Sequence, residues 1–105
     1  MRPSSQIARV VREGTALSSD RVVVYVAPGT GKSRAAWIAG RKVGSAVARN
    51  RARRVLRDTW GALAHEVRAG TDLVLVARPR IRGANAHDLV EEVARVLVRA
   101  GVIAR

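Results

Sequence analysis

The chain has 105 residues, with 20 lysines and arginines against 8 acidic residues and a formal net charge of +12. This length supports one small domain, and the absence of cysteine excludes a disulfide framework, a thiolate metal site and a cysteine nucleophile. The longest apolar runs, residues 22–27 and 73–77, are far shorter than the ~20 residues of a membrane helix. We expect no signal peptide and a cytoplasmic protein. So high a positive charge opposes compaction by self-repulsion, which indicates a polyanionic partner.

A short amphipathic helix is predicted at the start of the chain. Ser4 or Ser5 can cap it, and Gly14 ends it. Its apolar face carries Ile7, Val10 and Val11.

Strands are predicted on both sides of a glycine-rich turn. Residues 15–19 form a turn or a short strand, and the valine-rich residues 21–27 predict a strand. Residues 28–31 predict a turn, and residues 34–40 predict the next strand.

A long helix over residues 46–67, capped by Ser45, is predicted in the middle of the chain. At 3.6 residues per turn, eight residues fall near its buried face: Val47, Ala48, Ala52, Val55, Leu56, Thr59, Leu63 and Val67.

A strand over residues 72–78 follows, and Pro79 stops it. Asn85 and Asp88 favour the start of a last helix, which Gly101 closes. The order of helix, strands, helix, strand and helix indicates an α+β or α/β sandwich in one domain, residues 1–105.

Residues 27–33, with the sequence APGTGKS, are similar to a phosphate-binding loop that follows a strand. The full pattern needs glycine where Val26 stands, and it needs a helix after the loop. A hairpin turn is therefore the favoured interpretation, and we expect no nucleotide cofactor.

The strongest functional signal is a block of eight cations between Arg34 and Arg57 that contains no acidic residue. A solvated helix face normally mixes signs, because like charges at i,i+4 destabilise a helix. Arg49, Arg53 and Arg57 form two such like pairs, and Arg51 and Arg54 broaden the stripe. Arginine binds phosphate through two donors and stacks on bases, so this block predicts nucleic-acid binding.

No catalytic or metal-binding set of residues is predicted. His65 and His87 are isolated in the sequence, and Glu91 and Glu92 point to different faces of their helix. Asp72 is expected only to support a turn.

Residues 41–58, with the sequence RKVGSAVARNRARRVLRD, resemble the protein component of bacterial ribonuclease P. That family carries a basic pair, a Val/Ile-Gly step, Ala-Val, Arg-Asn-Arg and a second basic pair. The resemblance implies an α-β-β-β-α-β-α fold with a mainly antiparallel four-stranded sheet and a left-handed βαβ crossover. General statistics favour the right-handed form, and here we follow the family.

The resemblance also implies a function. The family protein assists a catalytic RNA that hydrolyses one phosphodiester bond to remove the 5′ leader of precursor tRNA, with Mg²⁺ held mainly by the RNA. We therefore expect no activity from the chain alone, no cofactor bound by its own residues, and no membrane partner. The residues expected to bind the RNA subunit are Arg41, Lys42, Arg49, Asn50, Arg51, Arg53, Arg54 and Arg57.

A cleft between the first helix and the sheet is expected to hold the leader, with Ile7, Val11 and Tyr25 at family positions. The family usually has aromatic residues where this chain has Ile7 and Val11, and often serines where it has Ile38 and Gly40. Its basic N-terminal extension is reduced here to residues 1–3. Charge alone equally allows a ribosomal or RNA-chaperone protein without a nuclease partner.

Overall fold

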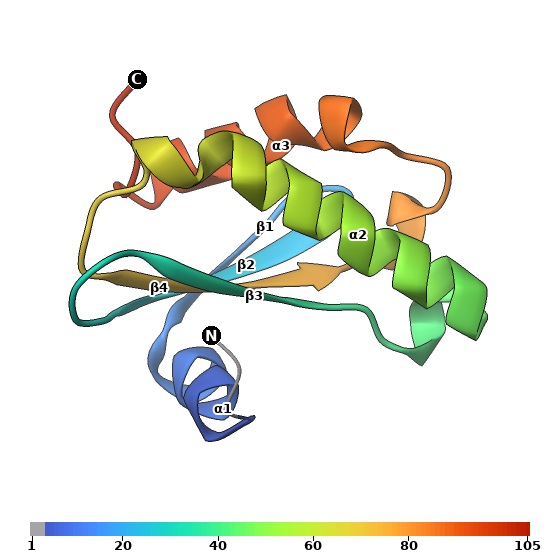
Figure 1. Ribbon diagram of the computed structural model, residues 1–105, viewed down its shortest axis with the longest axis horizontal. Coiled ribbons are helices and arrows are strands. Elements are labelled where there is room, and N and C mark those ends of the chain that lie inside the picture. The colour runs from blue at the N-terminus through green and yellow to red at the C-terminus, as the bar shows by residue number, and fades with distance from the viewer. Residues whose placement is uncertain (1–3) are drawn as a thin grey trace.

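The computed structural model describes residues 4–105, and the shortened extension at residues 1–3 lies outside the described part. A four-stranded sheet in the order β1-β2-β4-β3 forms its framework. The strands are β1 (Thr15–Ser18), β2 (Val22–Pro28), β3 (Arg34–Ile38) and β4 (Thr71–Ala77). Helix α1 (Ser4–Glu13) lies on one face of the sheet, and α2 (Ala46–Leu63) and α3 (Ala86–Arg99) lie on the other (Figure 1). Three short 3₁₀ helices connect these elements: η1 (Arg41–Val43), η2 (Ala64–Glu66) and η3 (Pro79–Ile81).

The strand pairing confirms a mainly antiparallel α+β fold. β2 pairs antiparallel with both β1 and β4, whereas β3 pairs parallel with β4. The parallel pair requires a crossover, and α2 supplies it above the sheet, with the left hand that the family resemblance implies (Figure 1). Within residues 4–105, no helix is both long and apolar enough to cross a membrane.

The larger core lies between the sheet and the helix pair α2 and α3. Strand residues alternate in direction, so Leu73 and Leu75 of β4 face the helices and are almost fully buried. Leu56 and Leu63 of α2 pack into the same core, as do residues of α3. Thr59 is also fully buried there, and its hydroxyl donates to the Val55 carbonyl at 2.8 Å, so it satisfies its own polar group.

Two expectations for the long helix are wrong. Val47 is 78% exposed, because it lies about 140° around the helix from Ala52 at roughly 100° per residue. The helix also ends at Leu63 and not at residue 67. The chain tightens into η2 and then becomes extended at Val67, which still reaches the core by that route.

The helix caps are as expected for α2 and α3 but not for α1. The Ser45 hydroxyl accepts from the Ala48 amide at 3.2 Å, and Asn85 and Asp88 form a reciprocal capping box. Ser4 and Ser5 lie inside the first turn of α1 and do not precede it, so neither is its cap.

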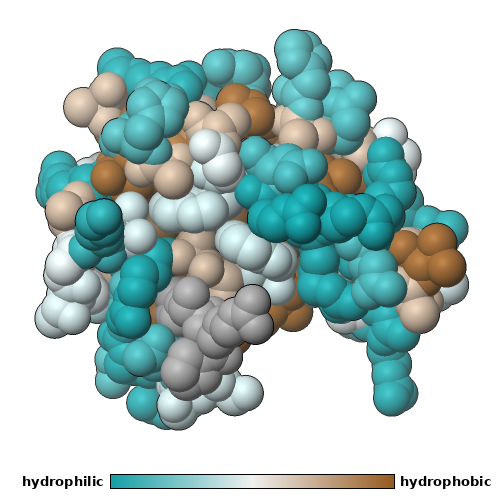
Figure 2. Space-filling view, viewed as in Figure 1, coloured by the Kyte–Doolittle hydropathy of each residue, from teal (hydrophilic) through white to brown (hydrophobic). Residues whose placement is uncertain are grey.

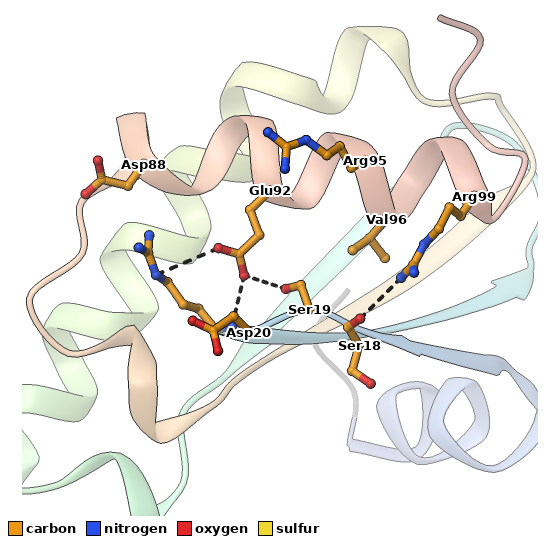
Figure 3. Close-up of a pocket in the computed structure, with 9 residues that line it drawn as sticks. Ser18, Ser19, Asp20, Asp88, Glu92, Arg95, Val96 and Arg99 are labelled. Carbon is orange, nitrogen blue, oxygen red and sulfur yellow. Dashed lines mark hydrogen bonds and ion pairs between the residues drawn. The ribbon is translucent and has the colours of Figure 1, made fainter.

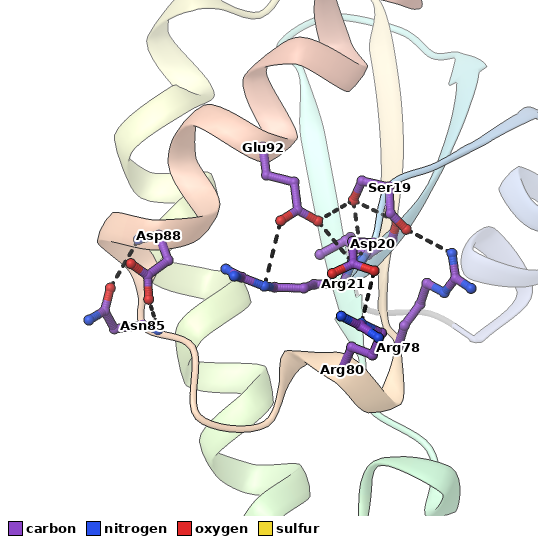
Figure 4. A network of polar contacts seen from close by, with 9 residues as sticks. Ser19, Asp20, Arg21, Arg78, Arg80, Asn85, Asp88 and Glu92 are labelled. Carbon is purple, nitrogen blue, oxygen red and sulfur yellow. Dashed lines mark hydrogen bonds and ion pairs between the residues drawn. The ribbon is translucent and has the colours of Figure 1, made fainter.

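The turn between β1 and β2 is fixed to α3 by one carboxylate (Figure 4). Glu92 accepts from the Ser19 hydroxyl at 2.6 Å and from the Arg21 amide at 2.8 Å. Its side chain is only 19% exposed. Because β1 is a short edge strand, this contact holds the hairpin against the rest of the fold.

We predict that Glu92→Ala lowers the free energy of unfolding by about 1.5–3 kcal/mol, since both lost hydrogen bonds go to a charged, partly buried group. Glu91→Ala is the matched control on the same helix. Glu91 is 66% exposed and pairs with Arg105, so its loss costs at most about 1 kcal/mol. Urea unfolding of the two variants measures the difference, and equal losses would contradict this role for Glu92.

Candidate nucleic-acid interface

Helix α2 and the preceding η1 carry a surface of basic and amide side chains, which we call the basic surface: Arg41, Lys42, Arg49, Asn50, Arg53, Arg54 and Arg57. Figure 2 shows hydrophilic side chains gathered over the middle and N-terminal half of α2. Arg49, Arg53 and Arg57 follow one another at i,i+4, so they form a row along one flank of the helix, as the sequence predicts.

Nearly all of this charge is left uncompensated by acids within residues 4–105. Arg57 contacts Asp58 at 3.3 Å, and this exposed pair is the only ion pair on the basic surface. Arg53 bonds instead to neutral groups, namely the Asn50 side chain and the Ala39 carbonyl. The acids lie elsewhere and have their own partners, so the basic surface faces solvent with a strong positive potential.

Arg51 does not broaden this row, and that expectation is wrong. It lies about 200° around the helix from Arg53, because the two residues are two positions apart at roughly 100° per position. Its guanidinium donates to the Ala84 carbonyl at 2.8 Å, in the loop before α3. Arg51 therefore belongs to the opposite flank of α2.

The face of the sheet that carries α1 presents a row of partly exposed apolar residues. The strand registers place Val23, Val76 and Ile38 side by side on this face, with Tyr25 one row away. We call these four residues the sheet floor. β3 leads from this floor through Gly40 into η1, so the floor ends close to Arg41 and Lys42 of the basic surface.

Helix α1 packs on the other half of this face and borders the sheet floor, and we call this border the α1 groove (Figure 1). Val10 is fully buried against Ala27, Ala36 and Val74, whereas Ile7 packs at the margin of that cluster together with Tyr25. Val11 is 38% exposed. The predicted leader residues Ile7, Val11 and Tyr25 thus lie on α1 and the sheet face next to it.

A buried carboxylate with two partly exposed arginines, which we call the Asp72 clamp, attaches α1 to the sheet. Asp72 of β4 is fully buried and accepts from Arg9 of α1 at 2.6 Å. It also accepts from Arg34 of β3 at 2.9 and 3.2 Å, and the register places these two residues directly opposite each other. Asp72 is therefore far more than the turn support that the sequence predicts.

The clamp has further polar contacts at its edge. Arg9 also donates to the Pro28 carbonyl at 3.2 Å, and Arg34 donates to the Gln6 side chain at 3.3 Å. The hydrogen bond and the negative charge of Asp72 raise the pKa of Arg34.

The loop at residues 28–33 is built around this clamp and not around a phosphate. A Cβ atom at Gly29 would lie 2.4 Å from the Asp72 carboxylate, so glycine is needed for close packing. The Gly29 amide donates to the Gly70 carbonyl, and the Gly70 amide donates to the Gly31 carbonyl. A strand and not a helix follows the loop, which differs from a phosphate-binding loop.

Residues 4–105 hold no cluster of three or more His, Cys, Asp or Glu residues that could bind a metal. His65 in η2 and His87 in α3 are both exposed. A hollow of about 570 Å³ lies between the β1–β2 turn and α3 (Figure 3). Its arginines, Arg21, Arg95 and Arg99, are balanced by Asp20, Asp88 and Glu92, so it lacks the excess charge that a phosphate site needs.

An additional ion pair network lies at the C-terminal end. Arg105 contacts Glu66 at 2.9 Å and Glu91 at 3.1 Å, which raises the pKa of Arg105. The hydrogen bond from Arg105 lowers the pKa of Glu66. This network neutralises its own charges and lies outside the basic surface.

A basic helix with one acid on it, on the opposite side of the sheet from a partly exposed apolar face, is typical of a nucleic-acid-binding protein of α+β fold. The family model for Ribonuclease P matches residues 1–101. The chain therefore belongs to the ribonuclease P protein family, whose members are the protein component of ribonuclease P in tRNA processing.

Individual relatives agree with this assignment. The chain is 32% identical over 98 residues to the ribonuclease P protein component of Caldanaerobacter subterraneus, covering 92% of this chain and 84% of the relative. It is 33% identical over 105 residues to that of Roseiflexus castenholzii, covering 98% and 86%.

Solved structures show the same fold. The RNase P protein of Staphylococcus aureus superposes with a TM-score of 0.84 at 20% identity, covering 99% of this chain and 96% of that chain. The RNase P protein from Thermotoga maritima gives a TM-score of 0.82 at 22% identity, covering 94% of each.

We predict that Asp72→Asn lowers the free energy of unfolding by about 3 kcal/mol. Removing one partner of a buried ion pair costs about 3–5 kcal/mol, and the arginines here reach solvent, which places the loss at the lower end. Asp58→Asn is the control, because Asp58 pairs with Arg57 on the surface. Urea unfolding that shows the same small loss for both variants would rule out the clamp as a main support of α1.

Proposed function

We propose that the basic surface binds the catalytic RNA subunit of ribonuclease P. The observation that carries this proposal is the row Arg49, Arg53 and Arg57, which repeats like charges at i,i+4 with a single exposed acid nearby. Bound phosphates remove the repulsion that this row creates within the free protein. Arg41, Lys42 and Arg54 are exposed on the same part of the molecule and extend the contact.

The groove between α1 and the sheet floor is proposed to hold the single-stranded 5′ leader of precursor tRNA. Unstacked bases can lie on the apolar floor, and Tyr25 offers a ring for stacking. The floor ends near Arg41 and Lys42, which can contact the phosphates of the same strand. With Ile7 and Val11 in place of the family's aromatic residues, the chain supplies fewer stacking surfaces, so its leader contacts depend more on charge.

The hydrolysis is proposed to belong to the RNA. The carboxylates of all eight acidic residues have hydrogen-bond or ion-pair partners within the fold, and the described residues do not fit a Mg²⁺ site. We therefore assign Mg²⁺ to the RNA subunit, and we expect the isolated chain to cleave no RNA. The protein contributes binding and positioning of the substrate, in the cytoplasm.

We predict a change in the slope of log binding constant against log salt concentration when Arg49, Arg53 and Arg57 are together changed to Gln. The slope should become shallower by about two to three. Each lost phosphate contact reduces the slope by about 0.7–0.9, and Gln keeps the helix propensity close to that of Arg. Filter binding to the RNA subunit over a range of salt concentrations measures the slope. Cleavage by the reconstituted particle should recover at saturating mutant protein.

The control is the same change at Arg68, Arg95 and Arg99, which are exposed and make no ion pair within residues 4–105. Arg105 is unsuitable as a control because it pairs with Glu66 and Glu91. Equal slopes for the two triple variants would show that only net charge matters. That result would favour a generic RNA-binding or RNA-chaperone protein.

We also predict that Ile7→Phe raises affinity for precursor tRNA about tenfold, because one aromatic–base stack contributes about 1–3 kcal/mol. Ile7→Leu supplies no ring and should leave the affinity unchanged. Mature tRNA, which has no leader, should bind both variants alike. An equal gain with mature tRNA would place the new contact outside the leader groove.

A further inference from the structure

A second concave site lies on the flank of α2 opposite the row Arg49, Arg53 and Arg57. It has a volume of about 350 Å³ and lies between the first half of α2 and the segment around η3. Ala52 and Ile81 form its buried apolar part, at 4% and 2% exposure. We call this site the η3 pocket, and its lining residues are Ala48, Arg51, Ala52, Ile81, Arg82 and Gly83.

The charge at the rim of this pocket has only one sign. Arg51 is held there by its hydrogen bond to the Ala84 carbonyl, which uses one Nη atom and leaves its other donors available. The Arg82 guanidinium passes over Gly44, where its Nη1 atom lies 3.3 Å from the position of a Cβ atom at that glycine. Within residues 4–105 neither arginine forms an ion pair, and no acid lines the pocket.

An apolar lining together with unpaired arginines distinguishes the η3 pocket from the larger hollow beside the β1–β2 turn. There, three arginines face three acids, and Glu92 is already bonded to Ser19 and to the Arg21 amide (Figure 3). In the η3 pocket two arginines surround an apolar floor without a counter-charge. A ligand that fits the η3 pocket has a flat apolar part with an anionic group directly beside that part.

We propose that the η3 pocket takes one unpaired nucleotide of the RNA subunit. This inference rests on the proposed function and adds a second contact to it. The base would lie against Ala48, Ala52 and Ile81, and its phosphates would meet Arg51 and Arg82. Guanidinium planes also stack on splayed-out bases, which suits arginine at the rim.

RNA is favoured over an acidic peptide because the pocket continues the basic surface. Ala48, Arg51 and Ala52 belong to the same helix as Arg49 and Arg53, and η1 packs beside η3. One RNA that lies across the N-terminal half of α2 can therefore reach both flanks. Arg51 belongs to the Arg-Asn-Arg sequence that predicts RNA binding, whereas Arg82 lies 31 positions further on, outside that pattern.

Crosslinking locates the contact directly. We would place the photoreactive residue p-benzoylphenylalanine at position 47 in one protein and at position 54 in another, and reconstitute each with the full RNA subunit. Val47 is exposed, lies one turn before Arg51 and does not line the pocket, so the probe leaves the pocket open. We expect position 47 to crosslink to a nucleotide that is unpaired in the RNA. Crosslinks from position 54 alone would contradict RNA binding in the η3 pocket and support RNA binding by the basic surface. Crosslinks from neither position would contradict both proposals.

Two variants separate the apolar and charged parts. Ala48→Met fills the pocket without changing charge, so RNA affinity should fall about tenfold while its salt slope stays the same. Arg82→Gln should flatten the slope by about 0.7–0.9, and Arg95→Gln is the matched control on α3, expected to change it little. If Ala48→Met and Arg82→Gln both bind RNA like the unaltered protein, the η3 pocket is not an RNA site. If the true ligand were an acidic peptide, both variants would likewise leave RNA binding unchanged.

Discussion

The Asp72 carboxylate is the contact on which the arrangement of the binding groove depends. It joins three elements that are distant in sequence, since Arg9 comes from α1, Arg34 from β3 and Asp72 itself from β4. A carboxylate buried this deeply needs charged partners, because an unpaired buried charge is strongly unfavourable. The groove wall formed by α1 is therefore placed by electrostatics as much as by the small apolar cluster around Val10.

The distribution of the eight acids explains why so basic a chain can fold and still present a strongly positive face. Glu92 holds the β1–β2 turn, Asp88 caps α3, and Glu66 and Glu91 fix Arg105. These four acids thus each stabilise a helix end, a turn or a contact between elements. Since only Asp58 lies on α2, positive charge remains concentrated where RNA is proposed to bind.

The sequence predicted local features well and the Asp72 clamp not at all. The caps at Ser45 and Asn85 were predictable because their hydrogen bonds reach only three residues along the chain. The partners of Asp72 lie 38 and 63 residues away, so no local pattern shows them. Helical geometry alone could have placed Val47 and Arg51 correctly, because both positions follow from roughly 100° per residue.

The sequence separation within the clamp also has a consequence for the order of folding. Helix α1 is made before the sheet during synthesis, yet two of the residues that hold it, Asp72 and Val74, belong to β4, the last of the four strands. A contact between residues so far apart can form only after the intervening chain has closed a long loop. The groove is therefore among the last parts of the molecule to assemble, and a nascent chain that has not yet produced β4 cannot have it.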